Sequence, residues 1–322
     1  MSKITHMRTV FLGTPWESVE ALKVLHKDSF FEIVSVITSP DKPVGRKQVV
    51  TKSEVKVYAE EQKIPVEHTE GKKERYIEIL KKYKPEIVVC KAFGEIIPKE
   101  FISYPKYGCI NIHFSILPKY RGAVPIQKAI LEGEKETGIT IMLMSEGLDE
   151  GDILKVFKEK IREDDSNISL RKRLVEKGNT VLIPTLMDWI NGEIVPSKQD
   201  HSKATYCWQK EISKERAEIH WDSYEPEYIE RMVRALLPWP IAWSMWNGKR
   251  IQIFDAEILS CNEQGLPGEL IIKNDSLLFK TKEKGKCIKV NELKVEGKKR
   301  MSATEALRGG TFAQAHSKPD SV

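Results

Sequence analysis

The feature that most constrains the fold is a regular alternation of short apolar runs with amphipathic segments over the first ~190 residues. Three of the apolar runs, at residues 8–13, 31–39 and 86–94, are rich in β-branched residues and end at glycine or polar residues, as buried strands do. Segments between them repeat apolar residues every three or four positions, which predicts helices at residues 18–27 and 75–85. Strands that alternate with helices usually form a mostly parallel sheet with right-handed crossovers.

The pattern changes after residue 190. A polar stretch without clear periodicity is followed by a helix that ends at Pro238, and then by short β-like runs separated by turn signals such as "NGK" and "NDS". Regular short strands of this kind suggest a small barrel. The expected fold class is therefore α/β: an N-terminal Rossmann-like, mostly parallel sheet with helices, followed by a small C-terminal β-barrel (OB-like) domain.

These boundaries divide the chain into four expected parts. They are a catalytic domain at 1–192, a linker at 193–212, a C-terminal β-barrel domain at 213–310 and a flexible tail at 311–322.

Composition excludes several classes of protein. No apolar run reaches the roughly 20 residues of a membrane helix, and the first residues lack a signal-peptide pattern. The five cysteines are scattered, with no CxxC pair, so we expect reduced thiols, a cytoplasmic protein, and neither a metal site nor a disulfide framework. The net charge of +5 permits a polyanionic partner without requiring one.

Two polar residues end an apolar run at residues 108–114. Asn111 and His113 are two positions apart, so both side chains project from the same face of the expected strand. Ligand sites in open α/β sheets lie beyond the carboxyl ends of the strands. A neutral imidazole there can accept a proton near pH 7, and an amide can donate to a developing oxyanion. The alternative is an ordinary core histidine.

A carboxylate would complete a catalytic set, and "EGLDEGDI" offers several. Asp149 lies in a glycine-bounded turn, and Glu146, Glu150 and Asp152 are close alternatives. Any of them could instead cap backbone N–H groups of the turn. Spacing alone leaves the choice open.

The combination "NIHFSILPKYRGAVPIQKAI" (111–130) followed by "ETGITIMLMSEGLDEGDIL" (136–154) closely resembles the folate-dependent formyltransferases. Segments 10–15 and 88–102 match the same family in order. The resemblance implies that formyl transfer is performed by Asn111, His113 and Asp149, with 10-formyltetrahydrofolate as co-substrate and no metal required. It also implies a folate site formed by Phe93, Gly94, Ile96, Ser115, Ile116, Leu117 and Pro118.

The second half resembles the members of this family that act on initiator methionyl-tRNA. Segments 234–253 and 297–310 look like their C-terminal barrel, and "DKPVGRKQ" (41–48) looks like their long basic loop. The implied activity is transfer of the formyl group to the α-amino group of methionine on initiator tRNA, for translation initiation, by a monomer. The implied tRNA contacts are Arg46, Lys47, Lys249, Arg250, Lys298 and Lys299.

Charge distribution bears on the tRNA partner. Residues 273–300 hold ten Lys and Arg against four Asp and Glu, so this segment carries more positive charge than the whole chain. A concentrated basic run favours a nucleic-acid footprint, although such runs are often simply solvated.

Two other functions remain open. A sugar-amine or glycinamide-type formyltransferase would share the same catalytic core, and a nucleic-acid-binding protein could carry a degenerate enzyme domain. A formylation assay with each acceptor would separate these alternatives.

Overall fold

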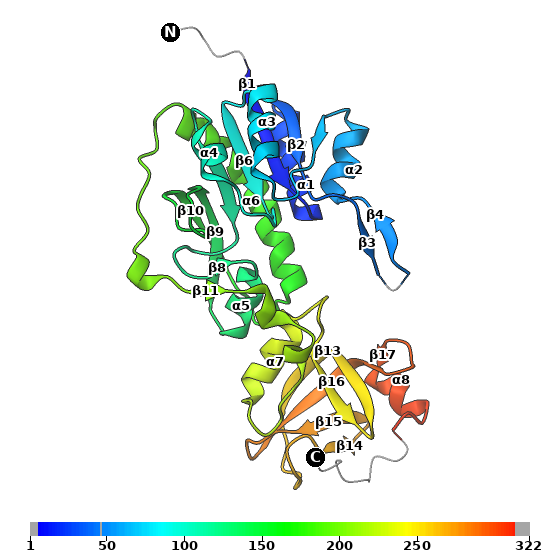
Figure 1. Cartoon of the computed structure of the whole chain (residues 1–322). Coiled ribbons are helices and arrows are strands. Elements are labelled where there is room, and N and C mark those ends of the chain that lie inside the picture. The colour runs from blue at the N-terminus through cyan, green and yellow to red at the C-terminus, as the bar shows by residue number, and fades with distance from the viewer. Residues whose placement is uncertain (1–5, 46, 313–322) are drawn as a thin grey trace. The chain divides into compact units, whose positions relative to one another are not determined.

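The structure of the chain is a computed structural model that describes residues 6–45 and 47–312. The chain divides into two compact units (Figure 1). The first comprises Met1–Ala123, Thr137–Lys160 and Lys172–Tyr206, and the second comprises Val124–Glu136, Ile161–Arg171 and Cys207–Val322. Each unit therefore contains segments that are distant in the sequence.

The first unit is built on a seven-stranded sheet with the order β10-β9-β7-β6-β1-β2-β5. Its strands are β1 (Met7–Gly13), β2 (Phe31–Ile37), β5 (Val66–Glu67), β6 (Ile87–Lys91), β7 (Cys109–His113), β9 (Glu136–Leu143) and β10 (Ile153–Lys160). From β5 to β7 all neighbours run parallel, and β9 runs antiparallel to β7. The expected mostly parallel α/β sheet is confirmed.

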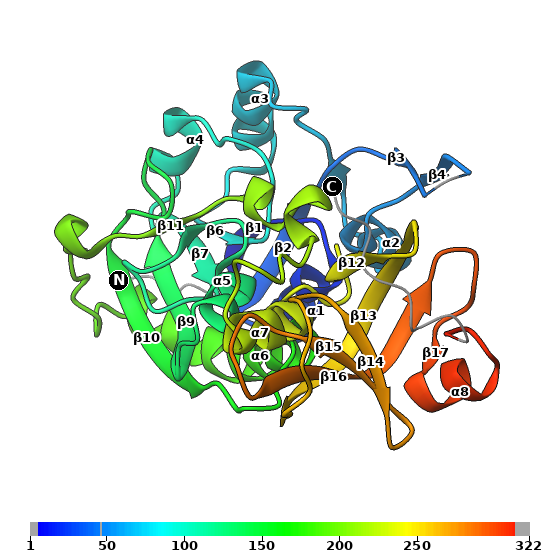
Figure 2. The ribbon, with the colours of Figure 1, turned by 90° about the horizontal axis from the view of Figure 1, so that it is seen from below.

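Helices cover both faces of this sheet (Figure 2). On one face, α3 (Lys73–Tyr83) and α4 (Lys99–Ser103) bury aromatic and aliphatic side chains against β1, β2 and β6. On the other lie α1 (Trp16–Lys27) and α6 (Asn167–Ile190). Parallel strands that are buried on both faces have apolar side chains at nearly every position. This explains why β1 and β6 carry so few polar residues.

The strand order indicates where a ligand site is expected. β1 pairs with β2 on one side and with β6 on the other. Strands that follow β1 in the sequence are first added on the β2 side and later on the β6 side, so the strand order reverses between β1 and β6. Ligand sites of open α/β sheets form at such switch points, beyond the carboxyl ends of the strands. Here β1, β6 and β7 end at Gly13, Lys91 and His113.

Residues 40–54 are more ordered than a structureless loop. β3 (Lys42–Val44) and β4 (Val49–Thr51) form a two-stranded antiparallel hairpin that projects from the first unit (Figure 1). The segment 41–48, which the sequence led us to expect as a long basic loop, thus belongs to a hairpin. Gly45 in its turn has a positive φ of 72°, which lets the chain fold back. α2 (Glu54–Glu61) follows at once, capped by the Ser53 side chain.

Short elements complete the first unit. β8 (Arg121–Gly122) pairs with β11 (Tyr206–Cys207), which follows the 3₁₀ turn His201–Lys203. No helix in the described part of the chain is both long and apolar enough to cross a membrane.

The second unit contains an antiparallel sheet of order β12-β13-β16-β15-β14, with β17 paired to β16. Its strands are β12 (Trp243–Trp246), β13 (Lys249–Ser260), β14 (Leu270–Lys273), β15 (Ser276–Lys280), β16 (Lys286–Val295) and β17 (Met301–Ser302). The sheet is a half-barrel, since β12 and β14 pair with no other strand among the described residues at the open ends. The expected C-terminal β domain is thus confirmed as an antiparallel half-barrel.

Helices pack on this half-barrel sheet. α7 (Pro226–Ala235) contacts β13 and β16, α8 (Ala303–Arg308) contacts β15 and β16, and α5 (Pro125–Leu131) packs on α7. Two further 3₁₀ turns span Gln209–Ile212 and Glu215–Ala217.

The cysteines divide into two groups. Cys261 and Cys287 are paired as a disulfide, so our expectation of reduced thiols throughout was wrong for this pair. The other three, Cys90, Cys109 and Cys207, are free and buried.

Candidate active site

β7 brings Asn111 and His113 to one face of the sheet edge. It pairs with β6 through Cys90 and Asn111, and with β9 through His113 and Thr140. These flanking strands fix the backbone on both sides, and His113 is only 6% exposed. The two polar side chains are therefore held in place by the sheet rather than by a flexible loop.

Asp149 meets both of them from the β9–β10 turn. Asn111 Nδ2 donates to Asp149 Oδ1 at 3.2 Å, and the backbone N–H of Gly122 donates to Asp149 Oδ2 at 2.8 Å. Asp149 has a left-handed φ of 50°, a conformation that aspartate tolerates better than most residues. The turn is built so that this carboxylate points to the end of β7.

The alternative carboxylates of the turn have other surroundings. Glu146 forms an exposed ion pair with Lys99 at 2.6 Å. The side chain of Glu150 is 39% exposed, and its Oε2 lies 4.0 Å from Arg121 Nη1. No described contact joins either of them, or Asp152, to His113. The structure thus brings Asp149 to Asn111 and His113, a choice that spacing left open.

The hydrogen bond of the His113 ring indicates which of its two nitrogens carries the proton. Nε2 lies 2.9 Å from the carbonyl oxygen of Tyr120. A carbonyl only accepts, so Nε2 carries the hydrogen and Nδ1 holds the lone pair of the neutral ring. Nδ1 lies 3.6 Å from Asp149 Oδ2, which is beyond hydrogen-bond distance but close enough for a strong interaction once Nδ1 is protonated.

Burial keeps this imidazole neutral. Loss of solvent lowers the pKa of His113 below its ordinary range, while the Asp149 carboxylate and the Tyr120 carbonyl oppose that shift and the Lys91 charge adds to it. The net direction is downward, so the ring is a neutral proton acceptor at pH 7.

Two residues that sequence reasoning missed support the Asp149 turn. Gln199 Nε2 donates to the carbonyl oxygens of Asp149 at 2.9 Å and Gly151 at 2.8 Å. Its Oε1 accepts two bonds from the guanidinium of Arg121, which has no exposed surface. Gln199 comes from a polar stretch without periodicity, so no local signal distinguishes it from solvated glutamines.

The loop after β6 holds three of the expected folate residues. Phe93 is half-buried, Gly94 has open space where a side chain would project, and Ile96 is 90% exposed. Glu95, which follows Gly94, anchors this loop by hydrogen bonds. Its Oε2 accepts from Thr69 Oγ1 at 2.5 Å, from the Gly71 N–H at 2.7 Å and from the Tyr76 hydroxyl at 3.1 Å. The loop is therefore anchored and has an open, partly apolar outer surface.

The other expected folate residues lie in the loop after β7. Ser115 and Leu117 are buried, with exposures of 0% and 4%, and Ile116 is half-buried. Thr140 Oγ1 donates to the Ser115 carbonyl and accepts from the Leu117 N–H. Buried side chains of this kind shape the loop and present no surface to a ligand. The peptide bond between Leu117 and Pro118 is cis.

The expected tRNA contacts come from both units. Lys47 is exposed in the β3–β4 turn, whereas Arg46 lies outside the described residues. In the second unit, Lys249 and Arg250 begin β13, and Lys298 and Lys299 follow β16, all of them exposed. Because β13 and β16 are antiparallel neighbours that pair Ile251 with Val295, these four cations meet at one end of the sheet.

Much of the basic run at 273–300 is neutralised by acidic residues. Lys273, Lys282, Lys286, Lys289 and Arg300 each form an ion pair with a glutamate. The sequence count therefore overstates the free positive charge of this segment. At the end of β13 and β16, by contrast, the side chains of Lys249, Arg250, Lys298 and Lys299 are exposed.

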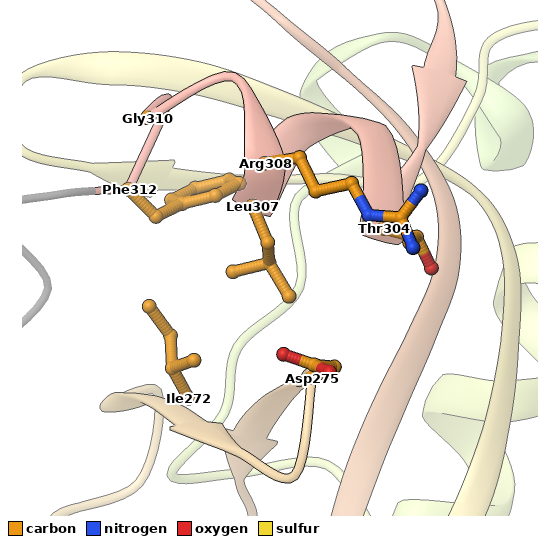
Figure 3. A pocket seen from close by; sticks show the side chains of 7 residues that line it. All are labelled: Ile272, Asp275, Thr304, Leu307, Arg308, Gly310 and Phe312. Atoms are coloured by element: carbon orange, nitrogen blue, oxygen red, sulfur yellow. The ribbon is translucent and has the colours of Figure 1, made fainter.

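A separate cavity of about 310 Å³ lies in the second unit, between α8 and the β14–β15 turn (Figure 3). Ile272, Leu307 and Phe312 form an apolar part, and Asp275 and Arg308 supply charge. All its lining residues belong to the second unit, whereas Asn111, His113 and Asp149 belong to the first. Across the described residues, no group of three or more His, Cys, Asp or Glu is arranged to hold a metal ion.

The two free thiols beside the site, Cys90 and Cys109, are buried. Burial raises the pKa of the Cys90 thiol to about 12 and raises that of Cys109 well above its ordinary value. Neither forms a thiolate at neutral pH.

Comparison with known proteins identifies the family. Residues 7–186 match the family model described as "Formyl transferase", and residues 211–311 match "Formyl transferase, C-terminal domain". The methionyl-tRNA formyltransferase of Halalkalibacterium halodurans is 44% identical over 94% of this chain and 95% of its own length. That of Caldicellulosiruptor saccharolyticus is 42% identical over 94% and 97%.

Solved structures share the fold at lower identity. An N-formyltransferase from Helicobacter canadensis, determined with folinic acid and dTDP-3-aminofucose, superposes with a TM-score of 0.65 at 21% identity, over 88% of this chain and 98% of its own. With two matching family models and full-length relatives above 40% identity, the chain belongs to the formyltransferase family, and within it to the methionyl-tRNA formyltransferases.

Proposed function

We propose that this chain transfers the formyl group of 10-formyltetrahydrofolate to the α-amino group of methionine on initiator methionyl-tRNA, and that Asn111, His113 and Asp149 carry the chemistry. The observation that carries these roles is the cluster at the end of β7, in which Asp149 bonds to Asn111 and lies 3.6 Å from His113 Nδ1. The activity itself follows from full-length relatives of that name.

His113 acts as the base. The acceptor amine must lose a proton as it attacks the formyl carbon, and Nδ1 offers the free lone pair of the ring. Nε2 stays bonded to the Tyr120 carbonyl, which keeps the ring orientation constant during proton transfer. Nδ1 accepts the proton directly or through one water.

Asp149 balances the charge that results. Protonation of Nδ1 creates an imidazolium facing Asp149 Oδ2, and the attraction between them is strong in a buried site. The Gly122 N–H and Gln199 bonds hold the carboxylate in place before that charge appears.

Asn111 stabilises the oxyanion. Attack on the formyl carbon produces a tetrahedral intermediate with a negative oxygen, and an amide N–H beside it lowers the barrier. One Nδ2 hydrogen is already donated to Asp149, which fixes the amide orientation and leaves the second hydrogen for the reacting oxygen.

The substrates have separate binding regions in this proposal. The pterin lies against the loop of Phe93, Gly94 and Ile96, with the 115–118 loop supporting the floor. The tRNA is held by the β3–β4 hairpin, through Arg46 and Lys47, and by the cations Lys249, Arg250, Lys298 and Lys299. We further propose residues 1–192 as the catalytic part and 213–310 as the tRNA-binding part, in a cytoplasmic monomer.

A competition among acceptors tests the activity. The purified protein is mixed with 10-formyltetrahydrofolate and, separately, with initiator Met-tRNA, a nucleotide-linked amino sugar or glycinamide ribonucleotide. We expect formylation of Met-tRNA alone. Formylation of the sugar or the ribonucleotide would move the chain to another branch of the family, and tRNA binding without any formylation would indicate a binding protein.

A further inference from the structure

A buried lysine lies directly behind the candidate active site. Lys91 is the last residue of β6 and is only 5% exposed. Its Nζ donates to the carbonyl oxygen of Ile112 at 3.0 Å and lies 2.9 Å from the centre of the Phe114 ring. Side chains alternate along a strand, so Ile112 and Phe114 project from the face of the sheet opposite to Asn111 and His113.

The surroundings of this ammonium come from the sheet and from two of its helices. A cavity of about 10 Å³, roughly the space of one water, is lined by Lys91, by Glu17 of α1 and by Asn179 of α6. The Lys91 backbone is fixed as well, because its carbonyl accepts from Ser18 Oγ at 2.6 Å. Residues of β6, α1 and α6 thus surround this buried charge.

Burying an ammonium group in a protein core costs free energy, because the charge loses its hydration. Replacing buried charges by apolar side chains of similar size is often neutral or stabilising, so packing alone does not explain a lysine at this position. Its hydrogen bond provides a more specific reason, since Ile112 is the residue between Asn111 and His113. The carbonyl that Lys91 holds therefore belongs to the short segment that carries both catalytic side chains.

We propose that Lys91 is a positioning residue for formyl transfer: from behind the sheet, its ammonium holds the segment between Asn111 and His113 and places a positive charge behind the catalytic base. This inference rests on the proposed role of His113. Aromatic contact with Phe114 stabilises the ammonium in its buried position. Because Lys91 is only 5% exposed, we expect its effect to fall on turnover rather than on binding.

Asp149 in the β9–β10 turn and Lys91 in β6 are the charged groups that act on the pKa of His113. Arg121 in β8, Glu17 in α1 and Cys90 in β6 are further buried ionisable groups of the first unit. Cys90 is a neutral thiol, and the guanidinium of Arg121 is bonded to Gln199. Burial, the largest effect, lowers the pKa of His113, Asp149 opposes that shift, and Lys91 reinforces it. Removing the Lys91 charge is therefore expected to raise that pKa.

The experiment compares Lys91→Met with wild type in the full-length protein. Methionine keeps the length of the side chain but removes the charge and the donor. The His113 imidazole is titrated by NMR in protein with labelled histidine, without either substrate, and we expect its pKa to rise. In steady-state assays kcat is expected to fall about tenfold, with little change in KM for either substrate.

Lys280→Met is the matched control. Lys280 is also a buried lysine, 7% exposed, but it lies in β15 of the second unit. We expect an unchanged His113 titration and kcat for this variant.

The result that overturns the inference is a Lys91→Met protein with the wild-type His113 titration and kcat; Lys91 would then only fill space. If Lys91→Met does not fold, Lys91→Gln serves in its place, with the same two readouts. Because the titration uses no substrate, it remains informative even if the acceptor proves to be something other than Met-tRNA.

Discussion

His113 Nδ1 lies 3.6 Å from Asp149 Oδ2, whereas Nε2 of the same ring lies 2.9 Å from the Tyr120 carbonyl. The imidazole is therefore oriented by a backbone carbonyl, and the carboxylate faces the nitrogen that is free to accept a proton. In many acid–histidine pairs the carboxylate orients the ring. Here orientation and charge balance come from different groups.

Removing the base tests its role directly. His113→Ala is expected to lower kcat by about 10²–10⁴, the range of one acid–base group, because no other described side chain offers a neutral acceptor at this position. Formylation of Met-tRNA is measured at saturating folate, with circular dichroism to check folding. A kcat within a few-fold of wild type would remove His113 from the mechanism.

The pH dependence follows from the direction of the His113 shift. Burial places its pKa below the ordinary value of about 6.5, so kcat at saturating concentrations of both substrates is expected to stay level through pH 6.5 and to fall only at lower pH. In Asp149→Asn the carboxylate that raises this pKa is lost, and the acid limb moves to still lower pH. An acid limb above pH 7 in wild type, or a limb that moves upward in the variant, would contradict this assignment.

Gln199→Leu tests the support of the Asp149 turn. The change removes the Gln199 acceptor from the Arg121 guanidinium and the Gln199 donor from two turn carbonyls, which is expected to cost about 1–3 kcal/mol in the free energy of unfolding. We expect kcat to fall about tenfold as Asp149 loses its position. Urea unfolding and kinetics measure the two effects, with Gln62→Leu on the exposed end of α2 as control. Unchanged kcat despite lower stability would show that Gln199 serves the fold alone.

Arg46→Ala tests the hairpin. Its neighbours Val44, Val49 and Val50 are exposed, so they do not pack into the core of the first unit, and the hairpin is available to a partner. We expect a loss in kcat/KM for tRNA of about 1–3 kcal/mol, as for a charge-assisted hydrogen bond, with folate affinity unchanged. Steady-state kinetics with each substrate varied in turn decide this. Equal losses toward both substrates would exclude a tRNA-specific contact.

The cations at the end of β13 and β16 give a salt-dependent prediction. The double variant Lys249→Ala, Lys299→Ala is expected to raise KM for tRNA and to reduce the slope of log KM against log salt by about one to two, since each lost phosphate contact releases fewer counterions. Lys172→Ala, an exposed lysine of α6, is the control. An unchanged salt slope in the double variant would place the tRNA elsewhere.

The sequence by itself determined the class of the fold. Apolar runs at the positions of β1, β2 and β6 predicted strands, and the periodic segments between them predicted α1 and α3. These signals are local, because burial of a strand or of one helix face imposes a pattern on consecutive residues. The paired positions of Asn111 and His113 were also readable, since two residues on one strand face always lie together.

The contacts of the carboxylate and the support of the site are visible only in the tertiary structure. Residue spacing left Asp149, Glu146, Glu150 and Asp152 open and the family resemblance implied Asp149, but only the folded chain shows that Asp149 contacts Asn111. Gln199 lies 50 residues after Asp149 and carries no pattern of its own. Its partners are backbone carbonyls and a buried guanidinium, and such contacts depend on where distant segments meet. The same holds for Lys91, since a single polar residue in an apolar run does not show which carbonyl its side chain reaches.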